Sequence, residues 1–320
     1  MKLGKIYELA VKFGIQNDPR SKVEINNELK KIKKEYGRLK GIDKKTFDRE
    51  RLKNPYSDTR ILNGSLNKEI KNIMAGIDIE VSEILLADRL IEKDIDIDLL
   101  LTHHPAGRAL SNLSLVMHLQ KNVLNKLGIK KEIADELMDE RIGEVSRGIS
   151  GRNHTRPVEA AKLLDLAFMC IHTPADNHVS NYLQGRFDKE KPKKAKDALS
   201  ILKSIPEYRI GMERDAGPVL IAGKEKDDAG KVFVDMTGGT EGSKKIFGRL
   251  SQAGVGTIVA MHLSEEHFKN AKSEHINIII AGHIASDNLG LNLLLDNLSK
   301  QGKEEFNVIN CSGFVRISRK

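Results

Sequence analysis

The pattern of apolar and polar positions predicts short strands that alternate with amphipathic helices from about residue 61 onward. Residues 73–79 and 98–102 are predicted strands, and residues 81–93 between them are a predicted helix. A strand, a helix and a strand in so short a span form a βαβ unit, whose two strands should be parallel. The helix should bury one apolar stripe, made of Ile84, Leu85, Leu90 and Ile91.

The same order of elements returns later in the chain. Residues 231–236 and 256–261 are predicted strands, and residues 241–253 are a predicted helix. Asp78 precedes His103 by 25 residues, and Asp235 precedes His262 by 27. This pattern indicates a divergent internal repeat of one βαβ unit. Further strands are predicted at 168–172 and 276–280, and further helices over most of 111–168 and at about 286–299.

These elements predict an α/β protein with two lobes that are related by the repeat. The first lobe should span residues 61–186 and the second residues 206–320. Residues 187–205 are rich in lysine and predict a connector with an exposed helix. Residues 1–60 predict two or three short helices, which would form a helical N-terminal extension.

The net charge of +8 is confined to that extension. Residues 1–60 contain 17 Lys and Arg against 9 Asp and Glu, whereas the remaining residues contain 36 of each sign. A basic segment can bind nucleic acid through its phosphates. The alternative is a solvated helical extension, because the lysines alternate with Leu29, Ile32 and Leu39.

Composition narrows the class of protein. Hydrophobic residues make up 39% of the chain and charged residues 31%, as in an ordinary soluble globular protein. The two cysteines, Cys170 and Cys311, predict neither a disulfide framework nor a thiolate metal site, and they favour a reducing cytoplasm. No apolar run is long enough to cross a bilayer, and Glu8 and Lys12 interrupt the N-terminal residues too early for a signal peptide.

Three polar clusters follow directly after short apolar strands. They are His103-His104-Pro105, residues 172–176 and residues 283–287. Open α/β sheets bind ligands outside the carboxyl ends of their strands. Imidazole and carboxylate groups are ligands for zinc, iron, manganese or cobalt. Each cluster alone is explained as well by a structural or surface role, but together they favour two metal ions that share a bridging carboxylate.

The same clusters resemble motifs of the NGG-one-interacting-factor-three-like family, whose members are often labelled type 2 homologues of GTP cyclohydrolase I. Residues 99–105, Leu-Leu-Leu-Thr-His-His-Pro, resemble the histidine motif of the family. Residues 171–176, Ile-His-Thr-Pro-Ala-Asp, resemble its second motif, usually His-Thr-Asn-Leu-Asp, and residues 179–183 resemble its Gly-Val-Asn stretch. Residues 281–287, Ala-Gly-His-Ile-Ala-Ser-Asp, resemble its C-terminal Gly-His-Tyr-x-x-Glu motif. The order agrees from about residue 61 to the end, and residues 1–60 fall outside the resemblance.

The resemblance implies a two-lobed α/β fold with the metal site between the lobes, often assembled into a ring-shaped homohexamer. It also implies two divalent transition-metal ions, such as zinc, iron or manganese. Asp287 stands where the family usually has glutamate, and its side chain is one methylene shorter, so Asp176 is the predicted bridge. Carried over position by position, the implied ligands are His103, His104, Asp176, His283 and Asp287.

The family also tends to carry a Gly-Glu and a later histidine before its last motif. His267 matches that histidine, but the glutamate is displaced, and Glu265 is one candidate for it. Asp176, His267 and Glu265 are therefore the predicted catalytic groups. The alternative for the last two, and for His262, is an ordinary place on the surface of a helix. His178 is close to Asp176 and is predicted to support the metal site.

The leading hypothesis is a metal-dependent hydrolase of a small molecule, in which two ions lower the pKa of a shared water. If the family label holds, the substrate is a purine nucleotide such as GTP. The turn at residues 237–240, predicted to open a helix, or the arginines near Arg152 would hold its phosphates. The alternative is a non-enzymatic metal-binding scaffold or regulator that uses residues 1–60 to bind nucleic acid or a protein partner. Neither hypothesis involves a membrane.

Overall fold

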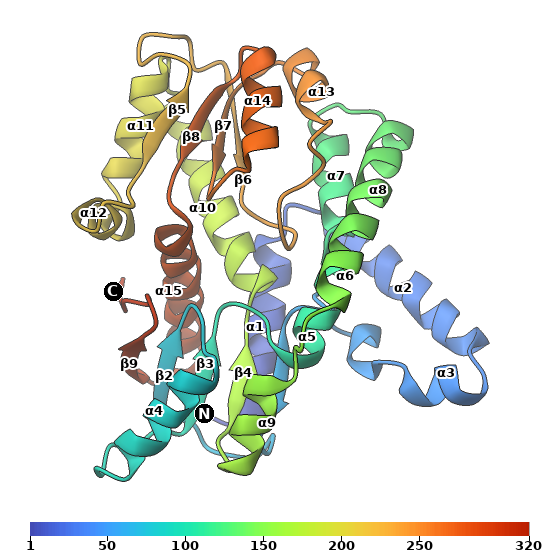
Figure 1. The fold of residues 1–320 in the computed structure, drawn as a ribbon, viewed down its shortest axis with the longest axis vertical. Coiled ribbons are helices and arrows are strands. Elements are labelled where there is room, and N and C mark those ends of the chain that lie inside the picture. Colours follow the sequence, from blue (N-terminus) through green and yellow to red (C-terminus); the bar gives the residue numbers. More distant parts are fainter. Residues whose placement is uncertain (320) are drawn as a thin grey trace.

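The computed structural model describes residues 1–319 and contains two β-sheets, one in each lobe (Figure 1). The first sheet has the strand order β1-β4-β3-β2-β9, and the second has the order β5-β8-β7-β6. The strands of the first sheet are β1 (Arg60–Asn63), β2 (Asn72–Gly76), β3 (Leu99–Thr102), β4 (Phe168–Cys170) and β9 (Asn307–Cys311). Those of the second are β5 (Val219–Ala222), β6 (Lys231–Asp235), β7 (Val255–Ala260) and β8 (Asn277–Ile280).

The two sheets repeat one arrangement, which confirms the predicted α/β fold and its internal repeat. In the first sheet β2, β3 and β4 are parallel, and β1 pairs antiparallel with β4. In the second sheet β6, β7 and β8 are parallel, and β5 pairs antiparallel with β8. Both antiparallel strands carry a register irregularity at the same place, between Ile61 and Asn63 and between Leu220 and Ala222. The repeat therefore extends beyond the βαβ unit to four strands.

The central strands are apolar because both faces of each sheet are covered. Successive side chains of a strand point to opposite faces, so Leu99 and Leu101 pack into one core and Leu100 into another. In the second sheet Val234 and Phe233 divide in the same way. Strands buried on both faces are expected to be continuous apolar runs, as these are.

Two long helices cross between the lobes and hold them together (Figure 1). Helix α10 (Thr173–Glu190) follows β4 of the first sheet, but Leu183 and Phe187 in its later turns pack into the core of the second lobe. Helix α15 (His283–Gly302) follows β8 of the second sheet, but Leu294 and Leu298 pack into the core of the first lobe, and β9 comes next. The two helices pack against each other. The structure thus differs from the predicted boundaries at residues 186 and 206, because each core contains a helix that starts in the other lobe.

The remaining helices cover the outer faces of the sheets. Helices α4 (Val81–Ile91) and α9 (Arg156–Leu163) pack on the first sheet. Helices α7 (His118–Lys126) and α8 (Lys131–Ser150) lie between β3 and β4 in sequence, yet they pack on the second sheet together with α13 (Phe247–Gln252) and α14 (Glu265–Ser273). The others are α5 (Gly107–Ser111), α6 (Leu113–Val116), α11 (Ala195–Lys203) and α12 (Pro206–Glu213).

Two predictions of helix burial were wrong. On α4, Ile84 is buried, but Leu85 is 51% exposed and Ile91 is 38% exposed. Ala87 takes the inward position, so the buried stripe is narrower than the apolar pattern indicated. The helix predicted to be exposed within 187–205 is α11, whose Ala198 and Leu202 are fully buried in the core of the second lobe.

The N-terminal segment contributes both to the core and to a projection. Helix α1 (Leu3–Asn17) packs against α10 and α15, and the helical spacing of Leu3, Ile6 and Phe13 places them in the core of the first lobe. Helices α2 (Lys22–Arg38), α3 (Gly41–Thr46) and the 3-10 turn η1 (Arg49–Leu52) stand out from the body (Figure 1). We call residues 22–53 the basic arm. Among residues 1–319 no helix combines the length and apolar character that a bilayer span requires.

Candidate metal centre

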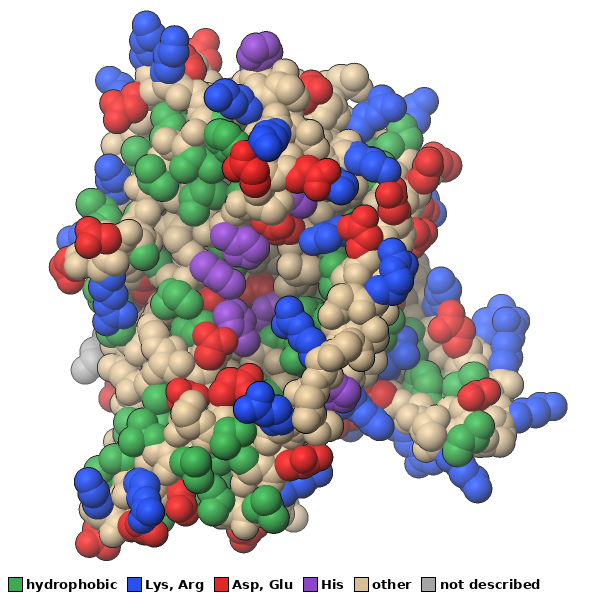
Figure 2. All heavy atoms as spheres, viewed as in Figure 1, with side chains coloured by type: hydrophobic (Ala, Val, Ile, Leu, Met, Phe, Trp, Pro, Cys, Tyr) green, Lys and Arg blue, Asp and Glu red, His purple; other side chains and the backbone are tan. Residues whose placement is uncertain are grey.

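Four imidazoles and two carboxylates meet in a cleft between the lobes, and Figure 2 shows the histidines gathered there in a hollow. The cleft has a volume of about 310 Å³. Its groups come from the carboxyl ends of three strands, as expected for an open α/β sheet. They are His103 and His104 after β3, His172 and Asp176 at the start of α10, and His283 and Asp287 at the start of α15.

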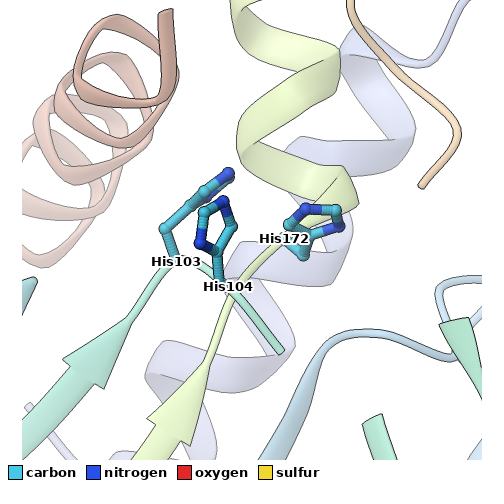
Figure 3. Close-up of side chains that lie close together, drawn as sticks. All are labelled: His103, His104 and His172. Atoms are coloured by element: carbon cyan, nitrogen blue, oxygen red, sulfur yellow. The ribbon is translucent and has the colours of Figure 1, made fainter. Parts of the chain in front are cut away.

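The adjacent residues His103 and His104 follow β3 and both belong to the cluster, His104 in the lining of the cleft and His103 buried (Figure 3). The Nδ1 atom of His103 lies 3.1 Å from the carbonyl oxygen of Ile171, to which it can donate. The Nδ1 atom of His104 lies 2.6 Å from Oδ1 of Asp78. Each ring therefore keeps its Nε2 atom for the cleft, which is the arrangement typical of metal-binding histidines.

The side chain of Asp287 is fully buried within the site. Its Oδ1 atom lies 3.4 Å from Nε2 of His103, and its Oδ2 atom lies 3.5 Å from Nε2 of both His104 and His283. Burial alone raises the pKa of Asp287, but His103 and His104 outweigh that effect and hold its pKa well below the usual range. The carboxylate is therefore charged at neutral pH.

Three buried atoms of the site have no hydrogen-bond partner within the described residues: Nε2 of His103 and both carboxylate oxygens of Asp287. A buried polar group without a partner costs free energy, and a buried charge costs more. A bound cation would satisfy all three atoms, because lone pairs of nitrogen and oxygen are what a transition-metal ion binds. The residues present therefore fit a divalent metal centre.

The possible ligand atoms form three overlapping groups. Asp287 belongs to two of them, whereas Asp176 belongs to one. The prediction of Asp176 as the shared carboxylate therefore finds less support in the geometry than Asp287 does. The groups are His103, His104 and His172; His104, His283 and Asp287; and His103, Asp176 and Asp287.

The sequence prediction placed His172 in a candidate cluster but left it out of the ligand set, and it gave Asp58 no role. Asp58 is fully buried, and its Oδ2 atom lies 2.8 Å from Nδ1 of His172 and accepts a hydrogen bond of 2.6 Å from the Thr173 hydroxyl. One signal for His172 was present, since His172 precedes Asp176 by four residues just as His283 precedes Asp287. Asp58 lies far away in the sequence, so its role depends on the fold.

The predicted catalytic residues lie in different surroundings. His267 lines the cleft, but its Nδ1 atom lies 2.6 Å from the Ser264 hydroxyl and its Nε2 atom 3.0 Å from the carbonyl oxygen of Gly242. Both of its nitrogens are thus occupied in holding a loop. Glu265 is exposed, pairs with Lys269 at 3.4 Å and is absent from the cleft lining.

Glu241 occupies the place in the cleft that the prediction gave to Glu265. It accepts a hydrogen bond of 2.7 Å from the backbone N–H of Ser264 and lies 3.2 Å from Nδ1 of His262. The ring of His262 lies against the ring of His283, with 4.8 Å between centroids. A carboxylate–imidazole pair therefore faces the metal ligands from the second lobe. Sequence spacing did not indicate it, because Glu241 lies in an irregular loop.

Two predictions about supporting groups were wrong. Residues 237–240 line the cleft but do not open a helix, because α13 begins only at Phe247. Instead, the Nε2 atom of Gln120 binds the carbonyl oxygens of Gly238 and Thr240 and fixes the loop. His178 points away from the ligands and lies among Asn17, Asn297 and the carbonyl oxygen of Pro174. Arg152, by contrast, does line the cleft.

The chain is similar to several solved structures. A NIF3 superfamily protein from Sphaerobacter thermophilus is 25% identical over 80% of this chain and 91% of that one, with a TM-score of 0.69. The protein ybgI, described as of unknown function, is 13% identical over 89% and 97% of the two chains, with a TM-score of 0.50. HcgD from Methanocaldococcus jannaschii is 18% identical over 79% and 87%, with a TM-score of 0.49. No family model and no curated protein matches the sequence.

Proposed function

We propose that this chain, which is similar to a NIF3 superfamily protein, is a hydrolase of a small molecule that uses two divalent metal ions. The observation that carries the proposal is the unpartnered pair of oxygens on Asp287, which is buried between two groups of imidazoles. Bound ions would supply Lewis acidity and would lower the pKa of a water molecule toward neutrality.

We assign the bridging position to Asp287. Its Oδ1 atom faces His103, and its Oδ2 atom faces His104 and His283, so one carboxylate serves both sides of the centre. Asp176 and His172 would be the further ligands of the ion on the His103 side of the centre. Nitrogen and oxygen ligands without thiolate are typical of zinc, iron or manganese.

The neighbouring residues hold the ligands in position. Asp78 and Asp58 lie within hydrogen-bonding distance of the Nδ1 atoms of His104 and His172, which fixes the rings and leaves each Nε2 atom free. On the opposite wall, Glu241 occupies Nδ1 of His262, so Nε2 of His262 is the nitrogen left to exchange a proton with a substrate. We therefore propose His262, held by Glu241, as the proton-transfer group in place of Glu265.

For the substrate we propose a purine nucleotide such as GTP, which is the activity that the family label names. The cleft, at about 310 Å³, lies at the small end of the range for ligand sites. Arg152 lies in its lining, where a guanidinium can pair with a phosphate. The family resemblance also leads us to propose a homohexamer, whose mass in sedimentation would be six times that of the 35.7 kDa chain.

Elemental analysis of the purified protein tests the metal centre. We expect about two equivalents of a transition metal per chain, which His103→Ala and Asp287→Ala should reduce. The matched control is Asp188→Ala, because Asp188 is exposed on α10 and lies outside the cleft. Absence of bound metal after reconstitution would overturn the centre.

Hydrolysis of GTP and other nucleotides by the metal-loaded protein tests the reaction. Asp176→Ala should abolish turnover while the fold survives. If the loaded protein turns over no nucleotide but still holds metal, the alternative of a metal-binding scaffold or regulator is the better hypothesis. Turnover therefore distinguishes the two hypotheses, whereas metal content does not, because both include bound metal.

A further inference from the structure

The basic arm, residues 22–53, keeps its cations exposed and turns most of its anions inward. Eleven of its twelve Lys and Arg side chains are exposed, whereas only two of its six carboxylates, Glu35 and Asp43, are exposed. Figure 2 shows Lys and Arg side chains gathered on this projection. The sequence gives the arm a net charge of +6, and the folding of the arm makes its outer surface more positive still.

The other four carboxylates of the arm are used to anchor it to the body. Glu28 pairs with the buried guanidinium of Arg20. Asp48 lies 2.9 Å from Arg60, and Glu50 lies 3.6 Å from the same guanidinium. Glu24 caps the start of α2 and accepts a hydrogen bond of 3.2 Å from Asn122 of α7. Since these bonds neutralise the inner charges, they leave the outer cations without counter-charges.

None of the eleven exposed cations makes an ion pair within the described residues. The tip of the arm is nevertheless ordered by aromatic contacts. Tyr36 of α2 packs against Phe47 with 4.9 Å between ring centroids, and Lys44 and Arg51 lie over these two rings. Helix α2 has 17 residues, which corresponds to a length of about 25 Å. The arm is therefore an anchored, extended row of unpaired positive charge.

We propose that the basic arm binds the phosphate backbone of a double-stranded nucleic acid. A duplex carries one negative charge per about 1.7 Å of its axis, so it offers a partner for each cation along an extended row. The rest of the chain carries a net charge of only +2, because the whole chain has +8 and the arm +6. The arm therefore supplies most of the attraction, and this inference is independent of the metal centre.

The composition of the arm argues against a membrane surface as the partner. Binding at a membrane interface combines lysines with a broad apolar face. Here the apolar residues Ile25 and Ile32 are buried, and only Val23 and Ile42 remain as large exposed apolar side chains. Two separated side chains do not form an apolar face.

Fluorescence anisotropy with labelled DNA and RNA duplexes tests the proposal. The test variant replaces six exposed lysines of the arm with glutamine at positions 30, 31, 33, 34, 44 and 45. We expect the full chain to bind at low salt and the variant to bind at least about tenfold more weakly. The slope of log affinity against log salt should fall by about 0.9 for each phosphate contact that is lost.

Two controls distinguish binding by the arm from an effect of the overall positive charge of the protein. The first replaces six exposed lysines of the body with glutamine, at positions 189, 193, 196, 203, 224 and 226, and it should keep its affinity within about twofold. The second replaces the six arm lysines with arginine, which keeps the charge and should keep the binding. The proposal is overturned if the full chain does not bind a duplex, if both glutamine variants weaken equally, or if the chain binds phosphatidylserine vesicles instead of duplexes.

Discussion

Asp176 and Asp287 approach the same atom, Nε2 of His103, each at a distance of 3.4 Å. Both residues lie four positions after a histidine, near the start of the helix that follows the last strand of its repeat. The internal repeat therefore supplies two equivalent carboxylates from the two halves of the chain. The centre exists only where the halves meet, so its ligand geometry depends on how α10 and α15 pack.

Asp287→Asn and Asp176→Asn should differ in metal content. Asp287 faces ligands on both sides of the centre, whereas Asp176 faces only the side of His103. We expect the Asp287 variant to lose both equivalents and the Asp176 variant to retain about one. Elemental analysis after identical reconstitution measures the difference. Equal losses in the two variants would count against Asp287 as the bridge.

Removal of metal should destabilise the whole protein, because the ligands join the two crossing helices. Saturation at 100 times the dissociation constant adds about 2.7 kcal/mol to the free energy of unfolding. A chelator should therefore lower the Tm of the wild type and leave that of Asp287→Asn unchanged. Calorimetry with and without chelator measures both. A wild-type Tm that ignores the chelator would show that metal does not stabilise the fold.

Asp78→Asn should weaken metal binding without contacting the metal. Oδ1 of Asp78 lies 2.6 Å from Nδ1 of His104 and holds that ring toward the cleft. Loss of a partner of this kind typically costs 10–100-fold in metal affinity. Competition with a fluorescent chelator measures the affinity. The control is Asp96→Asn, an exposed residue that forms no hydrogen bond with any ligand, and it should change nothing.

The sequence predicted the elements whose signal is local. The run from Leu99 to Leu101 is apolar at every position, and Thr102 and two histidines follow it, so both a buried strand and a site at its end were evident. The spacing of His283 and Asp287 is visible for the same reason. Even the repeat was detectable, because βαβ units leave a pattern within about 30 residues.

Features that depend on distant contacts were not predictable. Asp58 supports His172 only because β1 pairs antiparallel with β4, and β1 has just four residues. The crossing of α10 and α15 between the lobes leaves no local trace, since the apolar pattern of a helix does not show which sheet it packs against. Glu265 was predicted because it lies close to His267 in the sequence, whereas the fold brings Glu241, a loop residue, to His262.

His178 should make stability fall at acid pH. Burial lowers the pKa of this imidazole from 6.5 to about 4, so the unfolded chain binds its proton at higher pH than the folded chain does. The contribution of the neutral imidazole to the free energy of unfolding is present in full above pH 6.5. It is lost as the pH falls toward 4, at about 1.4 kcal/mol per pH unit and about 3 kcal/mol in all.

Urea unfolding of the metal-free wild type and of His178→Gln across this range measures the effect. Glutamine can still accept from Asn17 and Asn297 and has no titrating group. The difference in unfolding free energy between the two proteins should therefore shrink as the pH falls from 6.5 to 4. If the two plots of unfolding free energy against pH stayed parallel, the pKa of His178 would not be lowered in the folded protein.

Gly290 of α15 should control the metal site through helix packing. A Cβ atom at position 290 would lie 2.4 Å from the carbonyl oxygen of Ala175 on α10, so alanine forces the helices apart. Ala175 and Gly290 lie next to Asp176 and close to Asp287, and a shift here separates the two carboxylates. We expect Gly290→Ala to cost about 1–3 kcal/mol of unfolding free energy and to weaken metal binding as well.

Gly185→Ala on α10 is the matched control. Its Cβ atom would meet nothing within 4 Å, and alanine is about 1 kcal/mol better than glycine inside a helix. This variant should therefore be slightly more stable and should bind metal like the wild type. Because both changes replace a helical glycine with alanine, the contrast isolates the helix crossing. If Gly290→Ala bound metal with wild-type affinity, the spacing of α10 and α15 would not set the geometry of the centre.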